Sequence, residues 1–122
     1  MSSTPEKLVK KQIIEVLKKF GAYYFYPVTS GYGSSGVPDI VCCYKGLFVA
    51  IEVKAGKNKT TALQDKAIAA IRAAEGVALV TNETNVDQVT AVLRAIDEWG
   101  SYAAEYKLRP YIRLPTEGIP NA

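Results

Sequence analysis

Apolar residues recur at helical spacing near the start of the chain. At 100° per residue they form one stripe, made of Val9, Ile13, Val16, Leu17 and Phe20. Thr4 can serve as the N-cap, Pro5 suits the first turn, and Gly21 suits the stop. The pattern predicts a helix between Thr4 and Gly21.

Two further helices are expected in the second half of the chain. Residues from about 61 to 75 are rich in Ala, with Gly76 as the expected stop. Residues 86–99 carry a second amphipathic stripe of Val86, Val89, Val92, Leu93 and Ile96. Between the helices, "AYYFYPV", "VPDIVCCYKGLFVAIEVKAG" and "VALVT" indicate strands, the second as a hairpin around a Lys45-Gly46 turn.

The expected order of elements is therefore α-β-β-β-α-β-α, which favours an α/β (α+β) fold with a mixed sheet flanked by helices. At 122 residues the chain is long enough for one domain. We expect that domain at residues 1–99. Residues 100–122, with Pro110, Pro115 and Pro120, are expected to be a tail or arm of unknown role.

Composition narrows the possible chemistry. Apolar residues make up 48% of the chain and charged residues 22%, as in a folded globular protein, and no apolar run is long enough to span a membrane. The N-terminus lacks the apolar core of a signal peptide, so we expect a cytoplasmic protein. The chain has no histidine, which excludes Ser-His-Asp and Cys-His triads, HNH-type nucleases and His-ligated zinc. Cys42 and Cys43 are neighbours in a strand and are expected to be buried, reduced thiols.

Charge is distributed unevenly along the chain. Residues 1–59 contain nine lysines and four acidic residues, a balance of +5. Residues 75–105 contain six acidic residues against Arg94 alone. One basic and one acidic side are consistent with an oriented encounter with a polyanion.

The stretch "GYGSSG" at residues 31–36 matches the spacing of a dinucleotide-binding loop. Such a loop needs a helix after the third glycine, whereas Gly36 leads into "VPDIVCC", which has the pattern of a strand. No Lys-Ser or Lys-Thr pair follows, as a Walker loop would require. We therefore interpret these residues as a loop that leads to Asp39 rather than as a nucleotide site.

The predicted hairpin brings two carboxylates together. If Lys45-Gly46 forms the turn, paired positions sum to 91, so Asp39 lies opposite Glu52 and Lys54 projects from the same face. Facing carboxylates repel each other unless they are neutralised, and oxygen ligands suit Mg²⁺. The alternative is that Lys54 alone compensates the two charges in a purely structural network.

Two polar residues on apolar helix faces bear on this choice. Glu6 falls on the apolar stripe of the first helix, which leaves two roles open: a favourable interaction with the helix dipole, or a contact with the hairpin site. Gln64 shares a stripe with Ile68 and Ile71 at the start of the next helix. Taken with the hairpin trio, both favour a functional site.

These residues together resemble the PD-(D/E)xK nuclease superfamily. "VPDI" is followed by "IEVK" thirteen residues after its Asp, on a hairpin behind a helix. The glycine before the PD, Gln64 and Glu6 resemble the virus-type replication-repair nuclease branch, the VRR-NUC domain, in its stand-alone phage and bacterial form. The resemblance covers roughly residues 4–83.

The resemblance implies a role for each matching residue. Asp39 and Glu52 would bind Mg²⁺, or Mn²⁺ in its place, with the Val53 carbonyl as a further ligand and Glu6 as a ligand directly or through water. Lys54 would activate the attacking water and stabilise charge on the phosphate, and Gln64 would orient the site. The implied protein is a homodimeric endonuclease in a bacterial or phage-infected cell that cuts branched DNA, such as Holliday junctions, during replication or repair.

Other side chains are candidates for contacts with DNA. Lys57 and Lys59 follow the motif and suit flanking phosphates, and Lys10 lies near Glu6. Tyr32 in the Gly-rich loop could stack on an unpaired base. The sequence leaves two other functions open: a nucleic-acid-binding module on the same fold that does not cut, and a protein-interaction domain.

Overall fold

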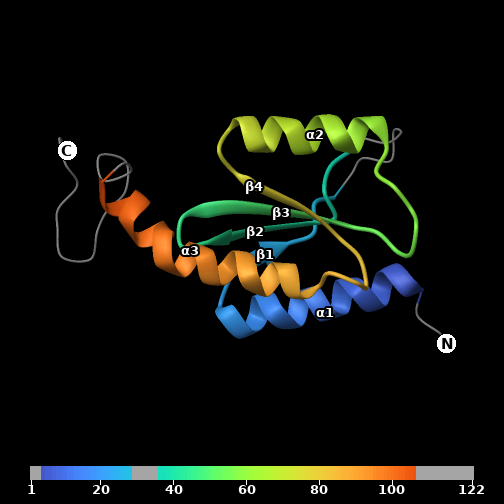
Figure 1. Cartoon of the computed structure of the whole chain (residues 1–122), viewed down its shortest axis with the longest axis horizontal. Helices are drawn as coiled ribbons and strands as arrows, with labels where there is room; N and C mark the ends of the chain where they lie inside the picture. The colour runs from blue at the N-terminus through green and yellow to red at the C-terminus, as the bar shows by residue number, and fades with distance from the viewer. Residues whose placement is uncertain (1–3, 29–35, 107–122) are drawn as a thin grey trace.

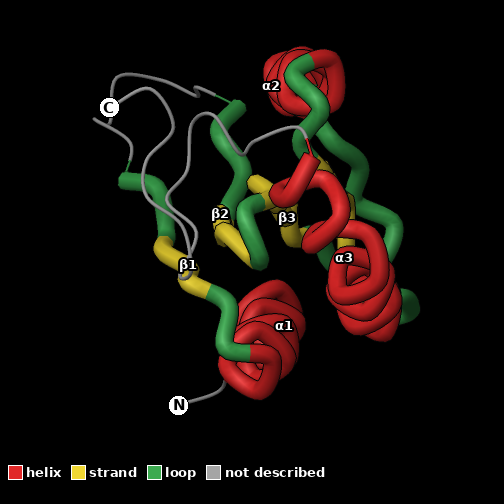
Figure 2. The backbone as a smooth tube through the Cα atoms, turned by 90° about the vertical axis from the view of Figure 1, so that its left-hand side faces the viewer, coloured by secondary structure: helices red, strands yellow, loops and turns green. Residues whose placement is uncertain are grey.

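The computed structural model describes residues 4–28 and 36–106, with residues 99–106 described as backbone only. Its elements follow the predicted order: α1 (Pro5–Phe20), β1 (Tyr23–Phe25), β2 (Ile40–Tyr44), β3 (Leu47–Val53), α2 (Ala62–Ala73), β4 (Val77–Thr81) and α3 (Asp87–Tyr106). The mixed α/β architecture is confirmed. Figure 1 and Figure 2 show three layers, with α2 over one face of the sheet and α1 and α3 over the other.

The sheet has the strand order β1-β2-β3-β4. The first three strands are antiparallel neighbours, whereas β4 runs parallel to β3 because α2 carries the chain back between them. The hairpin register confirms the prediction, since Tyr44 pairs with Leu47 and Ile40 with Ile51. Lys45 and Gly46 form the turn with φ of 48° and 86°, the left-handed pair that a tight hairpin turn requires.

Helix α1 has the predicted ends. The Thr4 side chain accepts a hydrogen bond from the Lys7 N–H at 3.2 Å, and Gly21 closes the helix in the left-handed region at φ 77°. Its apolar stripe packs into the main core, on the face of the sheet shared with α3. That core contains Val9, Ile13, Leu17, Ile40, Val49, Ile51, Val53, Leu79, Val89 and Leu93, among others.

The predicted end of α2 was wrong in detail. The helix ends at Ala73, and the left-handed residue is Glu75 at φ 67°, not Gly76. At Gly76 the requirement is close packing instead, because a Cβ there would lie 3.0 Å from Ile71 Cγ2. Gly76 therefore allows the chain to turn tightly under α2 into β4.

Helix α3 is longer than the sequence pattern indicated. It continues past residue 99 to Tyr106, so the expected boundary at 99 and 100 falls inside a helix. The spacing of Trp99, Ala103 and Tyr106 continues the helical pattern past Ile96, although Gly100 interrupts it. Asp97 ties α3 to the hairpin turn by accepting from the Tyr44 hydroxyl at 2.6 Å and pairing with Lys45 at 3.1 Å.

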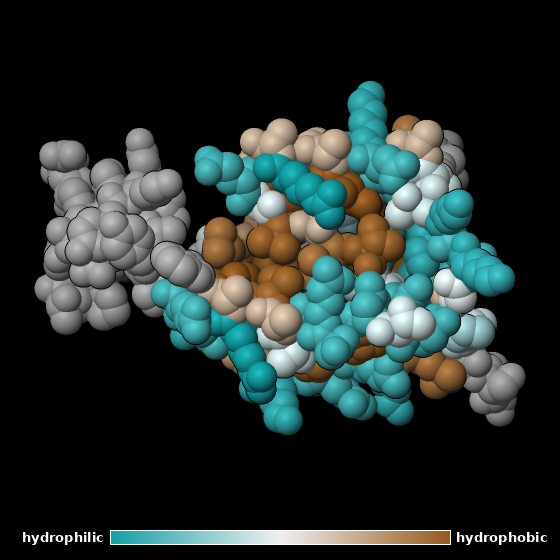
Figure 3. All heavy atoms as spheres, viewed as in Figure 1, coloured by the Kyte–Doolittle hydropathy of each residue, from teal (hydrophilic) through white to brown (hydrophobic). Residues whose placement is uncertain are grey.

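The α2 face of the sheet is less completely covered. Phe48 and Phe25 on this face are about half exposed, and Tyr23 is 73% exposed. Cys43 also faces this way and is exposed, contrary to the expectation for both cysteines, whereas Cys42 is buried in the main core. Figure 3 shows hydrophobic side chains along the surface between α2 and α3. None of the described helices has the length and apolar character needed to cross a bilayer.

Candidate active site

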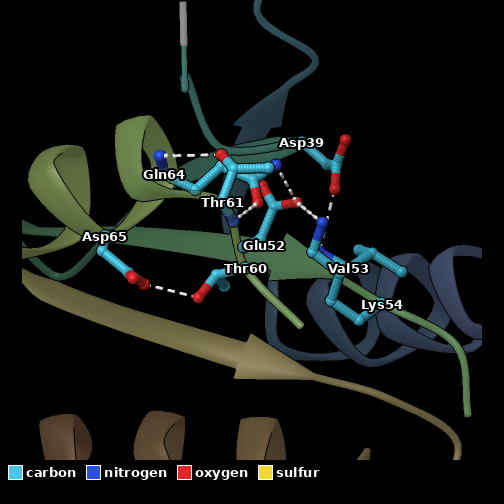
Figure 4. Close-up of polar contacts among 8 residues, drawn as sticks. All are labelled: Asp39, Glu52, Val53, Lys54, Thr60, Thr61, Gln64 and Asp65. Carbon is cyan, nitrogen blue, oxygen red and sulfur yellow. Dashed lines mark hydrogen bonds and ion pairs between the residues drawn. The ribbon is translucent and has the colours of Figure 1, made fainter. Parts of the chain in front are cut away.

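The candidate site lies where the hairpin strands end opposite the start of α2. In Figure 1 the end of β3 and the starts of α1 and α2 all lie toward the right-hand end of the molecule. Asp39 immediately precedes β2, and Glu52 and Val53 are the last residues of β3. The structure thus brings Asp39, Glu52, Lys54 and Gln64 into one neighbourhood, as Figure 4 shows.

Asp39 is fixed by the backbone of the opposite strand. Its Oδ2 accepts a hydrogen bond from the Val53 N–H at 2.8 Å. The next N–H along, that of Lys54, points the other way and donates to the Thr81 carbonyl on the β4 side at 2.9 Å. Because N–H directions alternate along a strand, the Asp39 carboxylate takes the donor on the β2 side where the backbone ladder has ended. One carboxylate oxygen is thereby anchored.

Glu52 is the most deeply buried ionisable residue of the site, at 3% exposure. Its Oε2 accepts from Gln64 Nε2 at 2.9 Å and lies 3.4 Å from Lys54 Nζ. Its Oε1 is buried and has no hydrogen-bond partner. An unsatisfied buried carboxylate oxygen is costly in a folded protein, and it is a common sign of a missing ion or water.

The pKa of Glu52 is raised to about 7, mainly by burial of its carboxyl group and next by the nearby charge of Asp39. The charge of Lys54 opposes this shift. The two carboxyl groups therefore resist being ionised together, as expected for two carboxylates that face each other across a strand pair. A bound cation would favour the ionised form of Glu52 and relieve this conflict.

Gln64 is oriented by the start of its own helix. Its Oε1 accepts from the Thr61 N–H at 2.9 Å while the Thr61 hydroxyl accepts from the Gln64 N–H, a reciprocal capping box. With its oxygen engaged there, its amide NH₂ is directed to Glu52. Thr61 was not among the predicted site residues, although the spacing Thr-x-x-Gln ahead of an apolar stripe is the signal that identifies a capping box.

Gly36 allows the segment before Asp39 to touch the backbone of α2. It has φ 73°, and a Cβ at this position would lie 2.4 Å from the Leu63 carbonyl oxygen and 2.9 Å from the Gln64 nitrogen. No other residue type fits such a contact with backbone atoms. The glycine ahead of the "PD" pair therefore sets the distance between the two segments that supply Asp39 and Gln64.

The other predicted site residues lie at different distances from this centre. Glu6 is exposed in the first turn of α1, where it lines a hollow of about 340 Å³ together with Ala55 and Asn58 of the loop that follows Lys54. It is beside the site but not joined to Asp39 and Glu52. Val53 contacts the site through its N–H, which donates to Asp39. Its carbonyl remains a predicted metal ligand.

The predicted DNA contacts are also distributed around the site. Lys57 and Lys59 are exposed in the loop after β3, and this loop is anchored where the Gly56 N–H donates to Glu83 at 3.0 Å. Lys10 lies on α1 over the ring of Tyr26. Tyr32 is outside the described residues.

The carboxylate oxygens of the site meet some of the requirements for binding a hard divalent cation. Within residues 4–28 and 36–98, no group of three or more Asp, Glu, Cys or His side chains is placed to hold a metal ion. Mg²⁺ in proteins often uses only one or two carboxylates and keeps several waters, so Asp39 and Glu52 meet that lower requirement. The unpartnered Glu52 Oε1 is the observation in favour of such an ion.

Comparisons with known proteins leave the family open. No protein-family model matches the chain, and no curated protein matches it. The arrangement of Asp39, Glu52, Lys54 and Gln64 therefore has to be interpreted from its own chemistry.

Proposed function

We propose that the protein is a divalent-metal-dependent DNA endonuclease with a PD-(D/E)xK core of the VRR-NUC type. In this proposal it is a homodimer that hydrolyses phosphodiester bonds in branched DNA. The observation that carries the proposal is the buried Glu52, whose Oε1 has no partner while its Oε2 is held by Lys54 and Gln64. A structural ion pair would be expected to satisfy both oxygens.

The residues divide the work of hydrolysis without a histidine. Asp39 and Glu52 would hold Mg²⁺ or Mn²⁺, which when bound polarises the phosphoryl oxygen and lowers the pKa of water. The Lys54 ammonium, 3.4 Å from Glu52, can donate to an attacking water or to the phosphate oxygens as negative charge develops there. Gln64 keeps Glu52 in place, and its own orientation is set by the Thr61 cap.

The test compares two lysine substitutions on the same hairpin. Lys54→Met keeps the apolar stem of the side chain but removes the charge beside Glu52. Lys45→Met breaks the ion pair with Asp97 at the other end of the hairpin. Labelled four-way junction, flap and duplex DNA would be incubated with each protein in Mg²⁺, Mn²⁺ or EDTA, and the products separated on denaturing gels.

We expect metal-dependent cutting by the wild type and by Lys45→Met, and a loss of roughly 10²-fold or more in Lys54→Met, the scale of one lost electrostatic stabiliser. Asp39→Asn should also be inactive. Cleavage by Lys54→Met at the wild-type rate would refute the assigned role. Binding of DNA without products in any metal would instead support a non-cleaving nucleic-acid-binding module.

A further inference from the structure

A second feature of the molecule is a hollow lined by lysines on the outer side of α1. Lys7, Lys10, Lys11 and Lys18 line a space of about 310 Å³ together with Tyr26, which follows β1. We call this the lysine groove. Glu15 is the one acidic residue in its lining, so four positive charges face one negative charge.

These lysines are not neutralised by neighbouring side chains. The two ion pairs formed within the described part of the chain involve Lys45 and Lys54, and neither includes a lysine of the groove. Lys7 and Lys11 are four residues apart on one helix, a spacing at which like charges destabilise the helix. The groove therefore concentrates positive charge that the fold itself does not use.

An aromatic ring borders the charged surface. Lys10 Nζ lies 5.4 Å from the centroid of the Tyr26 ring, which holds that ammonium over the ring face. Tyr26 is itself 48% exposed, so part of this residue is open to a ligand. Cations interleaved with an accessible aromatic ring suit a ligand that carries both phosphates and flat bases.

The groove begins at the same end of the molecule as the candidate active site, on the α1 side of the sheet. Phe25 pairs with Val41, so Tyr26, one residue further along, lies at the end of β2 that leads to Asp39. At its other side, the first turn of α1 shares a hollow with Ala55 and Asn58, directly after Lys54. Figure 1 shows the same relation, with α1 beginning at the site end and running away from it.

We propose that the lysine groove binds the sugar-phosphate backbone of the DNA that flanks the scissile phosphate. This inference rests on the proposed endonuclease function. From Lys7 to Lys18 the helix rises roughly 16 Å, which matches about five nucleotides of one strand of a duplex at a rise of about 3.4 Å each. The groove contributes affinity and direction rather than base sequence, because phosphate contacts carry no sequence information.

The experiment measures binding with two matched double variants. Lys11→Gln/Lys18→Gln removes two charges from the groove and leaves the Lys10–Tyr26 contact in place. Lys19→Gln/Arg94→Gln removes two charges from a different hollow, between α1 and α3, and changes the net charge equally. Lys18 and Lys19 both lie in the last turn of α1, and Gln is a good helix former, so effects on helix stability are matched.

Fluorescence anisotropy with labelled duplex and four-way junction DNA would be recorded in EDTA from about 0.05 to 0.2 M salt, with a thermal melt to verify folding. The slope of log affinity against log salt concentration is negative, and losing two phosphate contacts should make it less steep by about 2. Binding should also weaken roughly tenfold or more near 0.1 M salt. The control should retain the wild-type slope. Because no divalent metal is present, cleavage does not enter this measurement.

An unchanged slope in the groove variant would overturn the proposal, as would an equal loss in the control, since binding would then follow net charge alone. Failure of the wild type to bind DNA at low salt would also overturn it and would point to another anionic partner. A protein that binds DNA through the groove but never cuts would retain the groove as a DNA-binding surface and would refute the endonuclease function.

Discussion

At the scale of single residues, Glu52 determines what the site can do. Its carboxyl is buried among apolar strand residues because it lies on the covered part of β3, yet only one of its two oxygens is satisfied. Its pKa of about 7 lies above the ordinary value of 4.5, so the folded protein holds a proton that the unfolded chain releases. Stability without metal should therefore fall as pH rises from about 4.5 through about 7.

This effect predicts a measurable difference between two variants. In EDTA, the wild type should lose up to about 3 kcal/mol of unfolding free energy between pH 4.5 and 8 that Glu52→Gln does not lose. Glu15→Gln, at an exposed position, serves as the control and should behave as the wild type does. Denaturant unfolding at several pH values measures this, and parallel curves for wild type and Glu52→Gln would contradict the assignment.

At the scale of elements, the site depends on how closely the lead-in to β2 approaches the start of α2. Gly36→Ala should destabilise the protein by more than about 2 kcal/mol, since a left-handed Ala costs about 1–2 kcal/mol and the clash with Leu63 and Gln64 adds to it. Gly21→Ala is the matched control, because Gly21 has φ 77° and nothing within 4 Å of the added Cβ.

Chemical denaturation of both variants separates the cost of left-handed backbone strain from the cost of the clash with the α2 backbone. Gly21→Ala should show only the cost of the left-handed backbone. Gly36→Ala should show the larger loss and, where it still folds, reduced cleavage, because moving α2 withdraws Gln64 from Glu52. Equal losses in the two variants would show that the close approach at Gly36 is unimportant.

At the scale of the whole molecule, a metal ion that binds only the folded arrangement of Asp39 and Glu52 would stabilise the entire fold. The core cluster lies between the sheet and the α1/α3 layer, whereas the site lies on the α2 face. Mg²⁺ at about ten times its dissociation constant should therefore stabilise the wild type by about 1.4 kcal/mol and raise Tm by several degrees.

Asp39→Asn tests this coupling, since its amide oxygen can still accept from the Val53 N–H but its charge is gone. Its Tm should be insensitive to Mg²⁺. Differential scanning calorimetry with and without the ion gives the comparison. A wild type that shows no shift with Mg²⁺ or Mn²⁺ would remove the metal from the proposed mechanism.

Much of the fold was predictable because its signals are local. A two-residue turn determines hairpin register, so the approach of Asp39 to the end of β3 follows from counting outward from Lys45-Gly46. Caps at Thr4 and Gly21 likewise depend on only a few neighbouring residues. The end of α3 was not predicted, because Gly100, a residue type unfavourable inside helices, lies within its last turns.

The sequence by itself determined the order of the elements, the hairpin register and the pairing of Asp39 and Lys54 with Glu52, since each follows from spacing along a strand or helix. Only the tertiary structure decided that Gln64 donates to Glu52, that Gly36 contacts the backbone of α2, and that Cys43 is exposed. Those relations join segments whose separation depends on how layers pack. Packing is a property of the assembled fold, and no periodicity along one segment encodes it.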